Sequence, residues 1–182
     1  MQGLSADPAR ILVVDDERAV RELIARWLRG AGYDCSTADS PAAAWQQLQS
    51  GEIDLATLDI TMPGGSGLDL LDRIKAAFPD TAAIMLTAEG DASKAIRALT
   101  AGAYGYLLKP VEPDELKIQV RNALERRRLV IENRDYTQRL EQKVREQTGA
   151  IRLAHEETIY RLVKASLWRD EETGAHIQRT GQ

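Results

Sequence analysis

The chain has 182 residues, 43% of them apolar and 29% charged, which allows one globular domain of roughly 100–150 residues and an appended segment. Residues 1–120 hold 11 basic against 18 acidic side chains and residues 121–182 hold 13 against 10, so an acidic part precedes a mildly basic one. The single cysteine, Cys35, excludes an intrachain disulfide, and the lack of a signal peptide or of an apolar run of ~20 residues predicts a cytoplasmic protein outside the membrane.

Short apolar runs, each closed by a turn signal, are typical of buried strands. They occupy residues 11–14, 33–38, 53–59, 82–87 and 104–108. Between them, apolar residues recur at helical spacing, and the helix ends are marked by glycines, by Ser40-Pro41 and by Phe78-Pro79. The predicted helices cover residues 20–28, 42–48, 68–77, 92–100 and, from Asp114, a run without a clear stop for dozens of residues.

The alternation of strands with helices predicts βαβ units, and therefore a parallel sheet covered by helices on both faces. Five strands with five helices favour an α/β fold, the flavodoxin-like doubly wound sheet of order 2-1-3-4-5. In that order the first and third strands are neighbours. Their carboxyl ends would then bring Asp15, Asp16 and Asp59 together at the edge where ligands bind in such sheets.

Three carboxylates this close repel one another unless cations accompany them. Hard oxygen ligands favour Mg²⁺, with Mn²⁺ as the alternative, and Lys109 at the end of the fifth strand offers a basic side chain. Thr87, at the end of the fourth strand, adds a hydroxyl group. The alternative for each residue taken alone is a helix cap or an ordinary surface charge, but all of them fall at strand ends of one predicted sheet.

Five motifs resemble the receiver domain of two-component response regulators, and the match covers about residues 9–128. They are Asp15-Asp16, Asp59-x-x-Met62-Pro63-x-x-x-Gly67, Thr87-Ala88, Tyr106 and Lys109-Pro110. The resemblance implies that Asp59 accepts a phosphoryl group from a sensor histidine kinase. It also implies that Asp16, Asp59 and the backbone carbonyl of Thr61 ligate Mg²⁺, with Asp15 acting through a metal-bound water.

The resemblance assigns roles to the remaining motif residues as well. Lys109 would neutralise charge on the phosphoryl group, and Ala88 would leave room for that group to enter. Thr87 would donate its hydroxyl to a phosphoryl oxygen, after which Tyr106 would turn inward as the switch; the alternative for Tyr106 is an aromatic on a half-buried strand. Lys109-Pro110 is expected to be cis. No enzymatic activity is expected of this chain beyond self-phosphorylation and autodephosphorylation.

The basic part of the chain begins with Arg126-Arg127-Arg128. Such a run can contact nucleic acid, but glutamates intersperse it and no helix-turn-helix pattern follows, so a solvated helix face with no direct nucleic-acid contact is the favoured interpretation. Residues 129–156 predict a parallel homodimeric coiled coil with a stutter. Its seam would consist of Leu129, Asn133, Tyr136, Leu140, Val144, Gln147, Ile151 and Ala154. The alternative is a single, frayed helix.

The last segment, residues 157–182, resembles the start of an HD-GYP cyclic di-GMP phosphodiesterase domain. Glu172 and His176 match its first two metal-ligand positions, although they form an incomplete site, because the His-Asp pair and the Gly-Tyr-Pro signature that name the family are absent. We therefore expect a fragment of a longer regulator with a disordered N-terminus over residues 1–8. The alternatives are a stand-alone receiver adaptor, a carboxylate-metal hydrolase on the same fold and, from His155-Glu156, a kinase dimerisation helix.

Overall fold

The computed structural model describes residues 7–88 and 92–179, with side chains given as far as residue 164. The chain divides into two compact units, residues 1–131 and 132–182. The N-terminal segment predicted to be disordered lies outside the described residues, apart from residues 7 and 8. Within the described residues, no helix combines the length and the apolarity that crossing a membrane requires.

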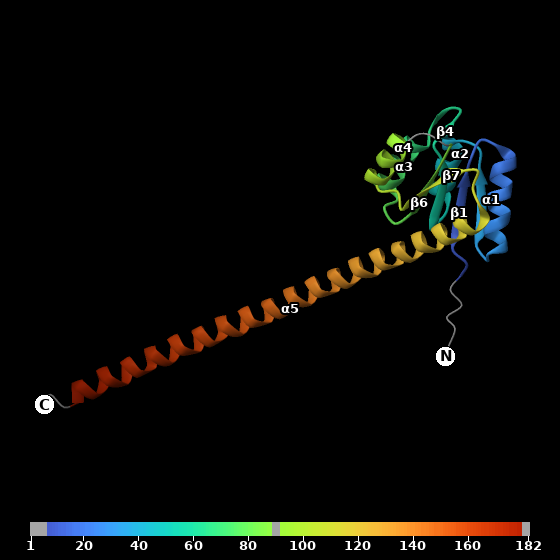
Figure 1. The fold of residues 1–182 in the computed structure, drawn as a ribbon. Coiled ribbons are helices and arrows are strands. Elements are labelled where there is room, and N and C mark those ends of the chain that lie inside the picture. Colours follow the sequence, from blue (N-terminus) through green and yellow to red (C-terminus); the bar gives the residue numbers. More distant parts are fainter. Residues whose placement is uncertain (1–6, 89–91, 180–182) are drawn as a thin grey trace, which may run out of the picture. The chain divides into compact units, whose positions relative to one another are not determined.

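The first unit is built on one parallel sheet, and its order confirms the predicted topology (Figure 1). The strands are β1 (Arg10–Val14), β2 (Asp34–Ala38), β3 (Leu55–Asp59), β6 (Ala82–Ala88) and β7 (Gly105–Lys109). They lie in the order β2-β1-β3-β6-β7, which is 2-1-3-4-5 when these five are counted along the chain. All neighbouring strands are parallel, so their carboxyl ends meet at one edge.

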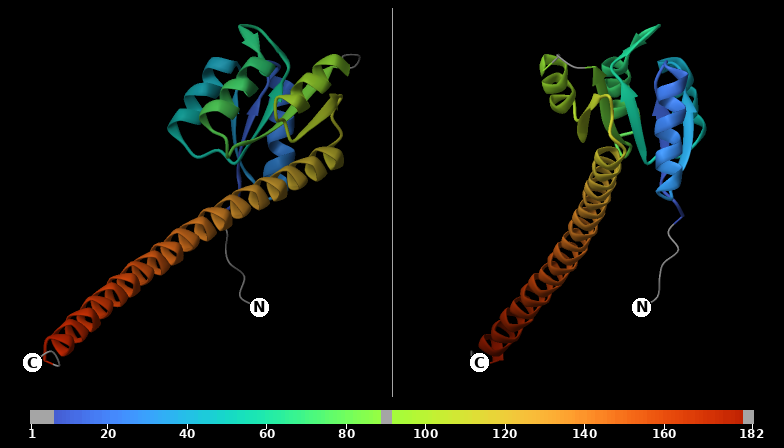
Figure 2. Two further views of the ribbon diagram at one scale, coloured as in Figure 1. Left: turned by 90° about the vertical axis from the view of Figure 1, so that its left-hand side faces the viewer. Right: turned by 45° about the vertical axis from the view of Figure 1, so that its right-hand side comes forward.

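Helices cover both faces of this sheet, as the views of Figure 2 show. They are α1 (Arg18–Gly30), α2 (Pro41–Ser50), α3 (Gly67–Ala77), α4 (Ala92–Thr100) and α5 (Pro113–Arg179). The strands alternate apolar side chains between two cores, one packed by α2, α3 and α4 and the other by α1 and α5. Residues such as Leu12 and Leu58 serve the first core, and Ile11 and Leu55 serve the second.

The helix ends follow the local signals. The Ser40 side chain accepts a hydrogen bond from the Ala43 amide at 3.3 Å, and Pro41 begins α2. One element was not predicted: residues after Asp59 form a two-stranded antiparallel ribbon, β4 (Thr61–Met62) with β5 (Gly65–Ser66). The sequence predicts only a loop there, because each strand has only two residues and glycines follow Pro63.

Within the first unit, α5 is fixed to the sheet by apolar and basic side chains. Leu116, Val120 and Ala123 are buried against the core shared with α1. The Arg127 guanidinium pairs with Asp54 Oδ1 at 2.9 Å, and its Nε donates to the Asp80 carbonyl. Arg126 lies over the Tyr104 ring and Arg128 pairs with Glu125. The arginine run is therefore engaged in contacts within its own unit.

The sequence predicts a nearly continuous helix from about residue 113 to 165, and in the second unit the chain is helical beyond that, to Arg179. A long C-terminal helix is thus confirmed, and it passes the predicted boundary at residue 157. The seam residues described, including Leu140 and Val144, are exposed in the single chain. The side chains of Glu172 and His176 lie outside the described residues, so their predicted role as metal ligands stays a prediction.

Gly67 joins the start of α3 to the end of β3. A Cβ atom there would overlap the carbonyl oxygen of Asp59 and lie 2.9 Å from its carbonyl carbon, so only glycine allows this approach. We predict that Gly67→Ala lowers the free energy of unfolding by about 1–3 kcal/mol, the usual effect of overpacking. Gly30→Ala is the matched control, because a Cβ at Gly30 meets nothing within 4 Å. Urea denaturation checks this; equal stability of the two variants would show that the contact is not tight.

Candidate phosphoryl-acceptor site

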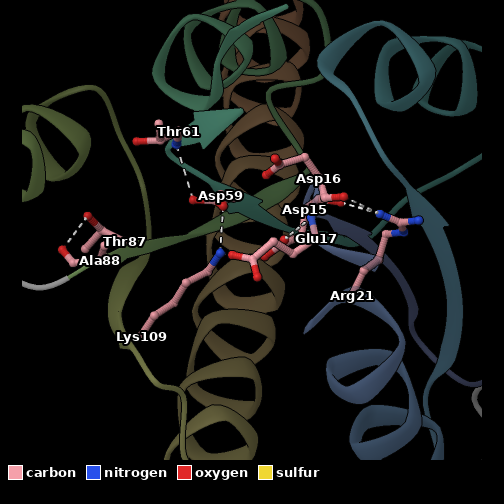
Figure 3. Close-up of polar contacts among 9 residues, drawn as sticks. All are labelled: Asp15, Asp16, Glu17, Arg21, Asp59, Thr61, Thr87, Ala88 and Lys109. Atoms are coloured by element: carbon pink, nitrogen blue, oxygen red, sulfur yellow. Dashed lines mark hydrogen bonds and ion pairs between the residues drawn. The ribbon is translucent and has the colours of Figure 1, made fainter. Parts of the chain in front are cut away.

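The carboxyl edge of the sheet gathers the acidic residues that the sequence predicted. Val14 and Leu58 are register partners on β1 and β3, so Asp15 and Asp59, one residue further on, lie side by side. Ligand oxygens of Asp15, Asp16 and Asp59 all lie within 4.8 Å of one another. Figure 3 shows the three carboxylates with Lys109 reaching them from the end of β7.

Asp59 is buried, and both of its carboxylate oxygens are held. Oδ2 lies 2.6 Å from Lys109 Nζ, and Oδ1 accepts a hydrogen bond from the Thr61 amide at 3.2 Å (Figure 3). Helix capping does not explain this carboxylate, because the helix that follows, α3, is capped by Ser66. Asp59 therefore has a fixed orientation at the mouth of the site and no cap to serve.

Asp15 is completely buried. Its Oδ1 accepts a hydrogen bond from the Glu17 amide at 2.9 Å, and its Oδ2 lies 2.8 Å from Lys109 Nζ. Burial nevertheless raises the pKa of Asp15 above 3.8, because desolvation outweighs the attraction of Lys109 and the Asp59 charge adds to it. One shared lysine is not enough to stabilise this carboxylate fully.

The cluster stabilises the charged form of Lys109, whereas burial destabilises the charged form of Asp15. Burial lowers the pKa of its ammonium group, but the hydrogen bonds to Asp15 and Asp59 outweigh this and leave the pKa raised above 10.5. The stability from a raised lysine pKa is present at neutral pH and is lost only as the pH rises through that pKa. Lys109 is therefore charged at neutral pH. The Lys109-Pro110 peptide bond is cis, as the resemblance implied.

The donor set fits a divalent cation. Three carboxylates face one ammonium group, so the cluster keeps negative charge, and Asp16 is only partly buried. Hard oxygen ligands with room for water are what Mg²⁺ takes in proteins, usually through one or two carboxylates. Asp16 and Asp59 are suited to hold it, and the Thr61 carbonyl as a further ligand stays a prediction.

The predicted switch residues lie at the same edge. Leu86 is the register partner of Asp59, and Thr87 and Ala88 follow it on β6. The Thr87 side chain is buried, and its hydroxyl donates to the Ala88 carbonyl oxygen at 3.2 Å. Tyr106 on β7 is 36% exposed, so its ring lies outward in this structure.

Two contributions at the site carried no sequence signal. The Glu17 amide holds Asp15, and Arg21 on α1 donates to the carbonyl oxygens of Asp15 and Asp16 (Figure 3). Both involve the backbone of the loop between β1 and α1. A contact to a backbone atom cannot be predicted from the types of the residues involved. Because α1 carries four arginines, the sequence also gives no reason to choose Arg21 among them.

Comparison with known proteins shows which family this part of the chain resembles. The family profile of the response regulator receiver domain matches residues 11–121. The DNA-binding transcriptional regulator NtrC of Rhizobium meliloti is 40% identical over 108 residues, which are 59% of this chain and 22% of that protein.

Solved structures agree. A response regulator receiver domain protein from Clostridium thermocellum is 38% identical with a TM-score of 0.64, covering 67% of this chain and 98% of that one. NtrX from Brucella abortus is 35% identical with a TM-score of 0.68, covering 71% and 29%. The chain spans about a quarter of the length of the curated regulators that it matches first.

The raised pKa of Asp15 has a consequence for stability. An aspartate whose folded pKa is raised contributes stability at low pH and loses it as the pH rises through that pKa. We predict that Asp15→Asn, which cannot ionise, is more stable than wild type at pH 7 without divalent cations, and that the gain shrinks towards pH 4. Urea denaturation across this pH range checks the prediction.

Asp54→Asn is the control for this experiment. Asp54 pairs with Arg127 at 2.9 Å, so its neutralisation should lower stability by up to ~1 kcal/mol. If Asp15→Asn is less stable than wild type at pH 7, the Asp15 carboxylate is not destabilised by its burial, and the prediction is wrong.

Proposed function

Because the chain belongs to the family of response regulator receiver domains, we propose that it takes a phosphoryl group onto Asp59 from a phosphohistidine of a sensor histidine kinase. The observation that carries this proposal is the Lys109 ammonium group, 2.6 Å from Asp59 and 2.8 Å from Asp15. This arrangement orients one carboxylate and supplies a cation for an incoming phosphoryl group. The location of this reaction in the cytoplasm stays a prediction.

In the proposed reaction a carboxylate oxygen of Asp59 attacks phosphorus while the phosphorus–nitrogen bond to the kinase histidine breaks. The electron pair leaves with the histidine, and an acyl phosphate forms on Asp59. The Thr61 amide and Lys109 hold the carboxylate in one orientation before the attack. When bound, Mg²⁺ would neutralise the charge that develops on the transferred group, with Asp16 and Asp59 as its protein ligands.

The acyl phosphate would then act on Thr87 and Tyr106. A phosphoryl group adds about −1.5 to −2 charge and strong acceptor oxygens. We propose that the Thr87 hydroxyl leaves the Ala88 carbonyl, 3.2 Å away, and donates to one of these oxygens. The outward Tyr106 ring would then move into the space that Thr87 vacates, which changes the face formed by α4, β7 and α5.

A hydrolase that uses the same carboxylates and metal is the competing function. Such an enzyme needs a group that activates water; both oxygens of Asp59 and Oδ2 of Asp15 are held by Lys109 or the Thr61 amide, which leaves the Asp16 carboxylate for that role. The match to the receiver domain family over residues 11–121 favours a single phosphoryl transfer followed by slow loss of phosphate over turnover of a substrate. Beyond self-phosphorylation and autodephosphorylation, we propose no enzymatic activity for this chain.

Asp59 should be the only aspartate modified by acetyl phosphate with Mg²⁺. We predict that intact-mass spectrometry shows one added phosphoryl group on the wild-type chain and none on Asp59→Asn. Asp39→Asn is the matched control, since Asp39 follows β2 at the same edge of the sheet and is exposed. A phosphoryl group on Asp59→Asn at the wild-type level would refute the assignment.

We further propose that residues 129–156 pair in parallel with a second copy of the chain. A helix this polar is marginal when isolated, and its apolar residues Leu140, Val144 and Ile151 are exposed in the single chain. Burial of each such side chain contributes roughly 1.5–3 kcal/mol, more than the ~1 kcal/mol cost of Gly149 in a helix. Asn133 on the seam would fix the register.

A charge introduced into the apolar stripe tests the dimer. Leu140→Lys should convert the chain to a monomer at micromolar concentration, because it buries an unpaired charge at the seam. Gln138→Lys adds the same charge about half a helical turn away and should stay dimeric. Light scattering measures the mass; a wild-type monomer, or a dimer that survives Leu140→Lys, would contradict the coiled coil.

For the output we propose a cyclic di-GMP phosphodiesterase that continues from residues 157–182. The apolar pattern supports a boundary there: residues up to Ala154 keep one narrow helical face, whereas Ile159, Tyr160, Leu162 and Val163 form one broad face and are exposed. A broader apolar face needs more cover than the seam of a two-stranded coiled coil provides. Glu172 and His176 would be its first two metal ligands.

The relatives suggest a different output. Several of them are named transcriptional regulators, and NtrC is named as DNA-binding, but the matched regions are only a minor part of those proteins. In this chain Arg126 and Arg127 contact Tyr104, Asp54 and Asp80, which favours no direct nucleic-acid contact by that run. A stand-alone adaptor is the other alternative. The reading frame beyond codon 182 distinguishes the three outputs.

A further inference from the structure

Arg21 makes two contacts to the loop that carries the metal-binding carboxylates. Its Nη1 donates to the carbonyl oxygen of Asp15 at 2.6 Å and to that of Asp16 at 3.3 Å (Figure 3). The side chain is only partly exposed. Neither the motifs nor the comparisons assign any role to this arginine.

The loop between β1 and α1 is held from two sides. On the inside, Lys109 pairs with the Asp15 carboxylate at 2.8 Å, and on the outside Arg21 binds the backbone carbonyls. The Asp15 amide also donates to the Ala38 carbonyl at 3.2 Å, which ties the same residue to β2. The orientation of the partly buried Asp16 side chain depends on this backbone, because the structure gives its carboxylate no hydrogen bond or ion pair within the described residues.

A guanidinium group is suited to this task. It offers several donors in a rigid plane and remains charged at all relevant pH values, so one side chain can hold two neighbouring carbonyls. Lysine offers a point charge without that fixed geometry. The alternatives to a positioning role are a general electrostatic effect on the acidic cluster and a simple anchor for the first turns of α1.

We propose that Arg21 is a positioning residue for phosphoryl transfer: it fixes the Asp15 and Asp16 carbonyls and thereby orients the Asp16 carboxylate for Mg²⁺. This inference rests on the proposed function, since it assigns Arg21 to the same site. Partners that orient metal ligands typically change metal affinity 10–100-fold when they are lost. Arg21 acts through one backbone unit, so we expect a change at the lower end of this range.

The test is an amide NMR titration with Mg²⁺ alone, using the full chain. Arg21→Ala should weaken Mg²⁺ binding about tenfold, and Arg21→Lys should restore part of it. Arg18→Ala removes the same charge three residues earlier on α1, where no contact to the loop exists among the described residues, and should change the affinity less than about twofold. Equal losses in Arg18→Ala and Arg21→Ala would reduce the effect to general electrostatics and overturn the proposal.

Hydrogen exchange of the Glu17 amide gives a second readout that needs neither metal nor phosphate. This amide donates to Asp15 Oδ1, so it should exchange faster in Arg21→Ala than in wild type or Arg18→Ala. A variant that melts at a lower temperature but keeps wild-type Mg²⁺ affinity would show a purely structural anchor and overturn the proposal. If the wild-type chain binds Mg²⁺ but Asp59 is not phosphorylated, that result counts against the proposed function. It leaves the role of Arg21 in orienting the Mg²⁺ ligands standing.

Discussion

The site depends on one ammonium group shared by two buried carboxylates. Lys109 Nζ lies 2.6 Å from Asp59 and 2.8 Å from Asp15, and it crosses from β7 past β6 to reach them. It orients the carboxylate of Asp59 without neutralising the whole cluster. Burial keeps the pKa of Asp15 raised even beside Lys109. Three carboxylates facing one ammonium group leave net negative charge, which is the condition under which a divalent cation can be accommodated.

The two edges of the sheet have different tasks. At the carboxyl edge the strands end in the acidic residues and Lys109, and Gly67 lets α3 start against the backbone of Asp59. At the opposite edge Arg127 joins α5 to Asp54 and Asp80, and Arg126 and Lys75 lie over the Tyr104 ring. Burial, with Arg126 adding to it, lowers the pKa of Lys75. The start of α5 is therefore fixed to the same sheet that carries the candidate phosphorylation site.

The sequence predicted the sheet order and the acidic cluster, because parallel strands bring their carboxyl ends to one edge whatever their exact lengths. It did not predict contacts that join distant positions without a periodic pattern. Arg127 contacts Asp54 and Asp80, which lie 47 or more residues earlier in the chain. Arg21 binds backbone carbonyl oxygens, and every residue type has such an oxygen. The requirement for glycine at residue 67 also arises only from three-dimensional approach. Pairing of the long helix stays a prediction, because a single chain shows only its exposed stripe.

The most direct test is a crystal structure with Mg²⁺ and beryllium trifluoride, an analogue of the phosphoryl group. We expect beryllium bonded to a carboxylate oxygen of Asp59, fluorine atoms in contact with Lys109 and the Thr87 hydroxyl, and the metal held by Asp16 and Asp59. A beryllium adduct on another residue, or a metal bound away from these carboxylates, would refute Asp59 as the phosphoryl acceptor.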